Sequence, residues 1–347
     1  MNDERVFPGR EWSKKPAVEM GFSESKLRVA SRHLYENAQD AFQVVVIRGG
    51  YLVAEWYRGC HPDDRFPMAS ASKGLISSML GIAIEEGKIS SLDDKVVDYY
   101  PEMMEVGENE GPKPGRFARE KDRDITFRQL ISNMSGYMKP GEVPGKVFHY
   151  QSFGMCILQH TIAKVYGYYD SQDPDRLPGY GDLLQEKIRD PIGGTWHWRF
   201  KRSGSTWYKL CEEAKEGIFG YFTEDIASTR DMARMAYLWL NRGNWAGRQV
   251  IPEWYVQEAT AIYPEVQASY PGPDRKFLEK FPGWIYSLGM FVTTDPENEE
   301  VLWNGGGGED VHINLCPELD LVVAQARVFE ERVTKGLYPL IVEACSL

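Results

Sequence analysis

The chain has 347 residues, of which 42% are hydrophobic and 26% are charged, and its formal net charge is −11. These values are typical of a globular protein that is long enough for a large core and two lobes. The negative charge argues against nucleic acid and anionic membranes as partners. No apolar run approaches the ~20 residues that span a bilayer. Because no signal peptide is visible either, we expect a cytoplasmic protein.

The cysteines and histidines do not suggest a metal site. The five cysteines are far apart and contain no C-x-x-C pair, and the six histidines do not cluster at metal-ligand spacing. We therefore expect no disulfide framework, no metal and no other cofactor.

Secondary structure is predicted from the period of the apolar residues, which is that of a helix in some segments and of a strand in others. Gly49-Gly50 joins the first two strands and is a strong signal for a hairpin. In chain order we expect a helix over 23–39, strands over 41–48 and 51–58, helices over 70–88, 126–133, 151–166, 223–241 and 252–261, strands over 284–293, 300–305, 311–316 and 319–326, and a final helix over 330–345.

Strands are thus predicted at both ends of the chain, and helices fill the middle. The most economical fold is α+β, in which both ends form one antiparallel sheet flanked by terminal helices. A mostly helical lobe is inserted between them. The predicted lobes are residues 1–60 with 281–347, and residues 61–280. A small-molecule site is expected in the cleft between the two lobes.

The most informative segment is Ser70-Ala71-Ser72-Lys73, at the start of the apolar helix. Residues three apart share a helix face, so Ser70 and Lys73 would stand side by side. A serine hydroxyl becomes a good nucleophile when a neighbour takes its proton, and a buried lysine can be that neighbour. The alternative is a buried helix start that Ser70 caps. The local sequence leaves both interpretations open.

The same spacing occurs a second time, at Ser23-Glu24-Ser25-Lys26. About one Ser-x-x-Lys tetrad is expected by chance in a chain of this size, so spacing alone proves little. A polar segment follows Lys26, which predicts a surface helix. Ser70 and Lys73 differ because the apolar residues that follow them can remove the pair from water.

Several segments, in order along the chain, resemble the serine β-lactamase and penicillin-binding-protein group, and most closely its class C-like carboxylesterases (family VIII type). The tetrad at 70–73 matches the nucleophile motif, and 148–154 resembles the Tyr-x-Asn segment. Residues 303–308 fall where the family has Lys-Thr-Gly. Asn133 replaces a histidine in the family's turn. The segments that resemble the family are 66–73, 86–94, 125–136, 148–154, 225–234, 283–289 and 303–308.

The resemblance implies a β-lactamase/transpeptidase-like fold and an acyl-enzyme mechanism. Ser70 would attack the acyl carbon and Lys73 would help to deprotonate it. Tyr150 would pass the proton to the leaving group and later activate water, which requires a cation to lower a pKa that is ordinarily about 10. The oxyanion hole would be the backbone N–H groups of Ser70 and Gly306. Residues that would contact the substrate are Ser152, Trp303, Asn304 and Gly305.

Two departures from the family pattern bear on the substrate. Trp303 replaces the lysine that helps to hold a substrate carboxylate, and a tryptophan offers an apolar or stacking surface instead. Ser152 replaces an asparagine that contacts the amide side chain of β-lactams. We therefore expect a serine hydrolase, foremost a carboxylesterase of neutral or hydrophobic esters. The alternatives are a β-lactamase, a D-amino-acid peptidase or amidase, an acyltransferase, and a non-catalytic binding protein on the same fold.

Other aromatic residues and histidines could be mistaken for parts of the site. The segment Trp196-His197-Trp198 could line an acyl pocket or form a packed loop. His149 is expected to point away from Tyr150 rather than to act as a base. His312 lies on a predicted strand and is expected to be structural.

Overall fold

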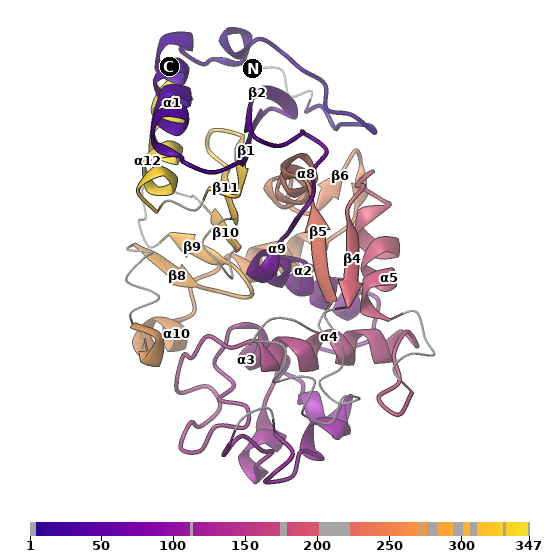
Figure 1. Ribbon diagram of the computed structural model, residues 1–347. Helices are drawn as coiled ribbons and strands as arrows, with labels where there is room; N and C mark the ends of the chain where they lie inside the picture. The colour runs from indigo at the N-terminus through magenta and orange to yellow at the C-terminus, as the bar shows by residue number, and fades with distance from the viewer. Residues whose placement is uncertain are drawn as a thin grey trace.

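A computed structural model describes residues 5–111, 114–173, 179–200, 223–270, 272–275, 283–293, 301–305, 311–328 and 331–345. Within these residues the central feature is a seven-stranded antiparallel sheet with helices on both faces (Figure 1). The strands of this sheet, in spatial order, are β2 (Tyr51–Arg58), β1 (Phe42–Arg48), β12 (Leu321–Ala326), β11 (Val311–Cys316), β10 (Val301–Gly305), β9 (Phe291–Thr293) and β8 (Trp284–Tyr286).

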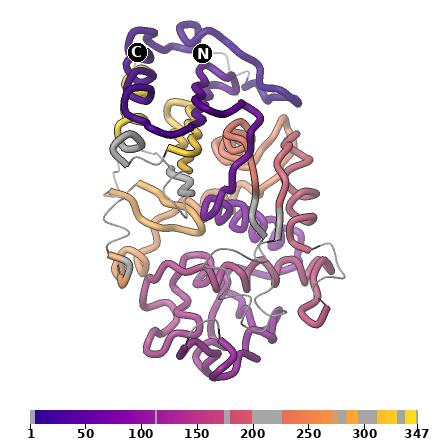
Figure 2. Tube along the Cα trace, in the orientation of Figure 1, coloured from indigo at the N-terminus to yellow at the C-terminus, as the bar shows by residue number. Residues whose placement is uncertain are grey.

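The two ends of the chain build this sheet together. β1 pairs with β2 on one side and with β12 on the other, so the N-terminal hairpin is continuous with the C-terminal strands. α1 (Glu24–Asn37) and α12 (Glu331–Cys345) pack side by side on one face, where the indigo and yellow ends of the trace meet (Figure 2). The fold class predicted from the sequence, an antiparallel sheet from both ends with a helical insertion, is confirmed.

β1 is buried on both faces, which explains the unbroken apolar run from Val44 to Ile47. Val44 packs in the cluster that contains the terminal helices, whereas Val45 packs in the larger core on the opposite face. The hairpin after β1 is also as predicted. Gly49 and Gly50 have φ values of 56° and 80°, and a two-residue turn of this kind needs positive φ at both positions.

In the described middle of the chain most regular elements are helices, and α2 lies in the main core with every residue from Ser72 to Ala83 buried. α8 also comes from the middle of the chain but packs on the sheet, against β1, β11 and β12. The lobe boundaries at 60/61 and 280/281 stay a prediction. None of the described helices combines the length and the apolar composition needed to cross a bilayer. The described α-helices between the two ends are α2 (Ser72–Glu85), α3 (Phe127–Ile131), α4 (Phe153–Val165), α5 (Tyr180–Leu184), α8 (Thr229–Leu240), α9 (Glu253–Ala259) and α10 (Pro264–Ser269).

Shorter elements complete the structure. Two small sheets have the strand orders β3-β5-β4 and β6-β7. Their strands are β3 (Phe66–Pro67), β4 (His197–Phe200), β5 (Thr223–Ala227), β6 (Asn244–Trp245) and β7 (Arg248–Gln249). The short helices are η1 (Ala17–Met20), η2 (Ala69–Ala71), η3 (Val96–Asp98), η4 (Pro101–Met104), η5 (Glu120–Asp124), the π-helix η6 (Gln185–Arg189) and η7 (Gly272–Asp274).

Two predicted elements are wrong in detail. The helix expected over 223–241 is strand β5 followed by α8, because Ser228 Oγ accepts the Asp231 N–H at 3.2 Å and caps a helix that begins there. The single strand expected over 284–293 is the hairpin β8–β9. Its turn contains Gly289, whose φ of 83° an extended strand does not tolerate.

Candidate active site

Ser70 lies in the 3₁₀ turn η2, directly before α2. The N-cap residues of η2 and α2 are Met68 and Ala71, and neither cap uses a side-chain hydrogen bond. The interpretation of Ser70 as a helix cap is therefore wrong. The residue before it, Ala69, has a φ of 46°, which is uncommon for a residue that carries a Cβ. The chain makes this unusual turn just before the serine.

Lys73 contacts Ser70 from the first turn of α2. Its Nζ donates a hydrogen bond to Ser70 Oγ at 2.9 Å, and the residue is only 2% exposed. A buried ammonium group is costly unless polar partners compensate for the lost water. The tetrad therefore places a desolvated basic group against a serine hydroxyl, which is the arrangement that Ser/Lys hydrolases use.

Tyr150 completes this group of three, from the segment just before α4. Lys73 Nζ lies 4.6 Å from the centroid of the Tyr150 ring, within the range of a cation–π contact. The structure thus brings Ser70, Lys73 and Tyr150 together, with Lys73 in contact with both of the others.

The second tetrad is arranged differently. Ser23 is the N-cap of α1, and its Oγ accepts the Lys26 N–H at 3.4 Å. The Lys26 side chain is half exposed and lies 3.4 Å from the Glu343 carboxylate. The predicted surface helix is confirmed, and among the described residues the hydrogen-bond partners of Ser23 Oγ are the Lys26 N–H and Ser25 Oγ.

The loop that leads to Ser70 is fixed by Gln43 of β1, which is fully buried. Its Nε2 donates to the His61 carbonyl at 2.6 Å, and its Oε1 accepts the Thr229 Oγ1–H at 3.0 Å. One amide therefore joins the 59–65 loop to the start of α8. β3, which follows this loop, pairs with β5, which precedes α8. The approach to the serine is anchored at two points.

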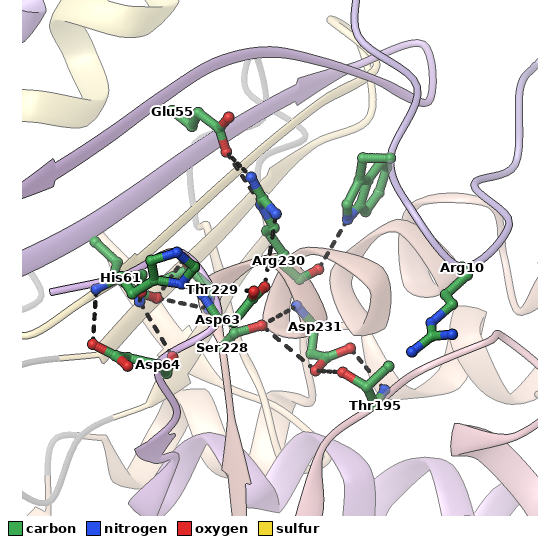
Figure 3. A network of polar contacts seen from close by, with 12 residues as sticks. Arg10, Glu55, His61, Asp63, Asp64, Thr195, Ser228, Thr229, Arg230 and Asp231 are labelled. Atoms are coloured by element: carbon green, nitrogen blue, oxygen red, sulfur yellow. Dashed lines mark hydrogen bonds and ion pairs between the residues drawn. The ribbon is translucent and has the colours of Figure 1, made fainter.

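A polar network surrounds this anchor (Figure 3). Arg230 binds Glu55 of β2 at 2.7 Å and lies 3.8 Å from Asp63 in the loop. Asp231, one residue on, accepts the Thr195 N–H at 2.9 Å and its hydroxyl at 2.8 Å. The N-terminus of α8 thus holds together the sheet, the loop before Ser70 and the chain before β4.

The predicted substrate-binding residues lie on two elements. β10 lies alongside η2 and α2, and it carries Trp303, Asn304 and Gly305, which pair in register with Ile313, His312 and Val311 of β11. Ser152 is the half-buried N-cap residue of α4 and makes no side-chain capping bond. Gly306, the predicted oxyanion donor, lies outside the described residues. The binding roles of these residues stay predictions.

The aromatic segment at 196–198 packs within the middle of the chain. Trp196 is 1% exposed and belongs to the main core. The Trp198 ring lies so close over Gly181 of α5 that an added Cβ there would be 2.0 Å from it. The sequence left open whether this segment lines an acyl pocket or packs against other residues. Trp196 and Trp198 are both packed against other residues.

The structure describes both histidines of interest, His149 and His312. His149 Nδ1 lies 2.8 Å from Glu142 Oε1, so its ring is directed to a carboxylate of the preceding loop, as expected. His312 is buried in β11, and burial lowers its pKa to about 4. A neutral, buried imidazole agrees with the structural role that we predicted.

Two residues near Tyr150 were not predicted as site residues. Tyr286 of β8 packs edge-on against the Tyr150 ring, with ring centroids 5.6 Å apart and an interplanar angle of 85°. Asn133, in the turn after α3, makes hydrogen bonds to the residues on both sides of Tyr150. The sequence signal for Asn133 was its departure from the family's histidine. We find no such signal for Tyr286.

Comparison with known proteins places this site in context. The Beta-lactamase family model matches residues 32–326. A 6-aminohexanoate-dimer hydrolase from Paenarthrobacter ureafaciens is 37% identical over 94% of this chain and 82% of that protein. A putative beta-lactamase from Bacteroides dorei superposes with a TM-score of 0.67 at 16% identity, over 93% of this chain and 99% of that one. A simvastatin synthase mutant from Aspergillus terreus also has a TM-score of 0.67, at 17% identity, over 92% of this chain and 94% of that one.

Proposed function

Because the chain belongs to the beta-lactamase family of serine hydrolases, we propose that Ser70 forms an acyl-enzyme and that the preferred substrates are neutral or hydrophobic carboxylic esters. One observation carries the proposal. The buried Lys73 donates to Ser70 Oγ at 2.9 Å and contacts the Tyr150 ring at 4.6 Å. Before any substrate binds, Ser70 therefore has beside it the lysine that would help to remove its proton, and the same lysine contacts Tyr150.

The reaction has two halves. In acylation, Ser70 Oγ bonds to the acyl carbon while its proton passes, with the help of Lys73, to the Tyr150 phenolate. The bond to the leaving alkoxide then breaks, and Tyr150 returns the proton to that oxygen. In deacylation, Tyr150 takes a proton from water and the hydroxide attacks the acyl carbon. The bond between that carbon and Ser70 Oγ then breaks, and Tyr150 returns the proton to Ser70 Oγ. Backbone N–H donors, with Gly306 the proposed second one, stabilise the oxyanion by roughly 3–4 kcal/mol each.

The preference for esters rests on the residues that replace the family's carboxylate-binding and amide-binding groups. Trp303 takes the place of a lysine, on a strand that lies beside η2. Ser152 takes the place of an asparagine and reaches less far than an amide would. A site without a strong carboxylate anchor still turns over esters, because alkoxides and phenoxides leave more easily than amines.

A second candidate is the hydrolysis of linear amides. It is favoured by the relative that is 37% identical over nearly the whole chain and is described as a 6-aminohexanoate-dimer hydrolase. The same three residues serve this reaction, with Tyr150 protonating an amine instead of an alkoxide. Acyl transfer would need an acceptor other than water to reach the same acyl-enzyme.

A substrate panel tests the proposal. We would compare kcat/KM for p-nitrophenyl esters of two, four and eight carbons, for the linear 6-aminohexanoate dimer and for a chromogenic cephalosporin, with Ser70→Ala as the control. We expect the esters to be fastest and every activity to be lost in Ser70→Ala. Fastest turnover of the linear amide would select the second candidate, whereas fastest turnover of the cephalosporin would contradict both.

A further inference from the structure

We propose that Asn133 positions Tyr150 by accepting hydrogen bonds from the residues directly before and after it. This inference rests on the function proposed for Tyr150 above. Asn133 lies in the turn after α3 and is fully buried. It touches neither Ser70 nor Lys73 by any hydrogen bond within the described residues. Its effect on the reaction would therefore act through Tyr150.

Two hydrogen bonds tie the segment around Tyr150 to this one residue. The Asn133 carbonyl accepts the His149 N–H at 3.0 Å, and Asn133 Oδ1 accepts the Gln151 N–H at 3.0 Å. The residues before and after Tyr150 are thus both bound to Asn133. A backbone segment held at both ends leaves little freedom for the direction in which its central side chain projects.

Asparagine suits this position for two separate reasons. Its φ of 60° lies in the left-handed region, which asparagine tolerates better than most residues other than glycine. Its side chain also has the length and the acceptor needed to reach the Gln151 N–H. Glycine would keep the backbone conformation but lose the second bond, whereas aspartate would keep both the tolerance of positive φ and the acceptor oxygen.

The Asn133 side chain also influences Tyr286, whose ring packs against that of Tyr150. Within the described part of the chain, its Nδ2 is buried and makes no hydrogen bond, and the same holds for the Tyr286 hydroxyl. Burial and the neighbouring Tyr150 raise the pKa of Tyr286 well above its usual value, and the Asn133 side chain opposes this rise. The two hydrogen bonds to the His149 and Gln151 N–H groups are the contacts through which Asn133 acts on Tyr150.

The turn that carries Asn133 is itself well fixed. Thr126 and Gln129 form a capping box at the start of α3, and the Asn133 N–H donates to the Leu130 carbonyl at 3.1 Å. Arg128 binds Asp93 with two hydrogen bonds, at 2.7 and 2.9 Å. Asn133 thus follows directly after the C-cap of a well-anchored helix, so α3 helps to fix the position of Tyr150.

The first test compares three variants by steady-state kinetics with the best ester, corrected for the fraction of folded protein. Asn133→Gly removes the bond to Gln151, and we expect kcat to fall roughly 10- to 100-fold because a displacement of about 1 Å can have that effect. KM should stay within threefold. Asn133→Asp restores the acceptor and should recover most of kcat at high pH. Asn244→Ala is the matched control, since Asn244 Oδ1 accepts the Gly247 N–H at 3.0 Å in the β6–β7 turn.

The pH profile separates positioning from a general loss of stability. The carboxylate of Asn133→Asp disfavours a phenolate nearby, so the acid limb of kcat should move to higher pH in this variant alone. An Asn133→Gly variant with kcat within twofold of wild type would overturn the inference. Equal losses of kcat in Asn133→Gly and Asn244→Ala would also overturn it.

A second measurement does not depend on turnover. With ¹³C at Cζ of tyrosine, the Tyr150 signal is assigned by its disappearance in Tyr150→Phe. We expect this signal to shift in Asn133→Gly and to stay in place in Asn244→Ala. If wild type hydrolyses nothing, the proposed function fails, and this signal still decides the inference. An unchanged Tyr150 signal in Asn133→Gly would show that Asn133 does not position the ring.

Discussion

Two serines with the same spacing to a lysine have different surroundings in this protein. The Ser23 hydroxyl accepts a backbone N–H of its own helix, and the Lys26 ammonium lies at the surface. The Ser70 hydroxyl accepts a hydrogen bond from Lys73. It is available for this contact because neither η2 nor α2 is capped by a side-chain hydrogen bond. Burial of Lys73 and the absence of a capping bond at Ser70 separate the two cases, and spacing alone could not.

A buried lysine with the catalytic task proposed for Lys73 should be costly for stability. Lys73→Met removes the ammonium and keeps an unbranched chain of similar length. Because a buried charge often destabilises relative to an apolar residue of similar volume, we expect Tm to be equal to or above that of wild type. The rate of Ser70 acylation should fall roughly 10²- to 10⁴-fold.

Differential scanning fluorimetry and pre-steady-state acylation measure the two effects, with Lys26→Met as the matched control that changes neither. A lower Tm with unchanged acylation would mean that Lys73 is structural.

At the scale of elements, α2 is held in place by the turn between β8 and β9. Ser77 Oγ donates to the Leu288 carbonyl at 2.6 Å and lies 2.9 Å from the Tyr255 hydroxyl. A Cβ at Gly289 would lie 2.9 Å from the Lys73 carbonyl. The turn therefore lies directly on the part of α2 that carries Lys73, and it connects the sheet to the predicted nucleophile.

This contact predicts a large effect from one methyl group. Gly289→Ala combines positive φ with a clash against α2, so we expect the free energy of unfolding to fall by about 2–4 kcal/mol. Gly87→Ala is the control, because Gly87 also has a positive φ of 67° but nothing lies within 4 Å of an added Cβ. That variant should lose about 1 kcal/mol. Urea unfolding measures both, and equal losses would show that the contact with α2 is unimportant.

Comparison of the predicted and observed elements shows what the sequence could and could not predict. The large sheet's strands β1, β2, β10, β11 and β12, the Gly49-Gly50 hairpin and the terminal helices were predictable because their apolar periods are clear. The break at Ser228 was missed although its capping residues are visible, because the apolar pattern on both sides suggests one helix. The turn at 287–290 was missed because β-forming residues flank it without interruption. Asn133 acts through backbone groups, and no sequence pattern records those contacts.

At the scale of the whole molecule, the sheet joins both ends of the chain and buries an ionisable group in its middle. His312 lies in β11, and burial lowers its pKa from 6.5 to about 4. Between these two values the unfolded chain binds a proton that the folded protein does not. The contribution of His312 is therefore complete above about pH 6.5 and is lost as the pH falls toward 4.

The loss amounts to about 3 kcal/mol at ~1.4 kcal/mol for each pKa unit. We expect His312→Gln to remove this part of the difference in unfolding free energy between pH 7 and pH 4.5. His61→Gln should keep it, since the His61 side chain is 71% exposed. Equal pH dependence in wild type and His312→Gln would contradict the burial of a neutral imidazole.

The central claim is that Ser70 is an activated nucleophile. Labelling with a fluorophosphonate, followed by intact-protein mass spectrometry and peptide mapping, tests it most directly. We predict one adduct on wild type that maps to Ser70, no adduct on Ser70→Ala, and wild-type labelling of Ser23→Ala. A wild-type protein without an adduct, or an adduct that persists in Ser70→Ala, would contradict the account.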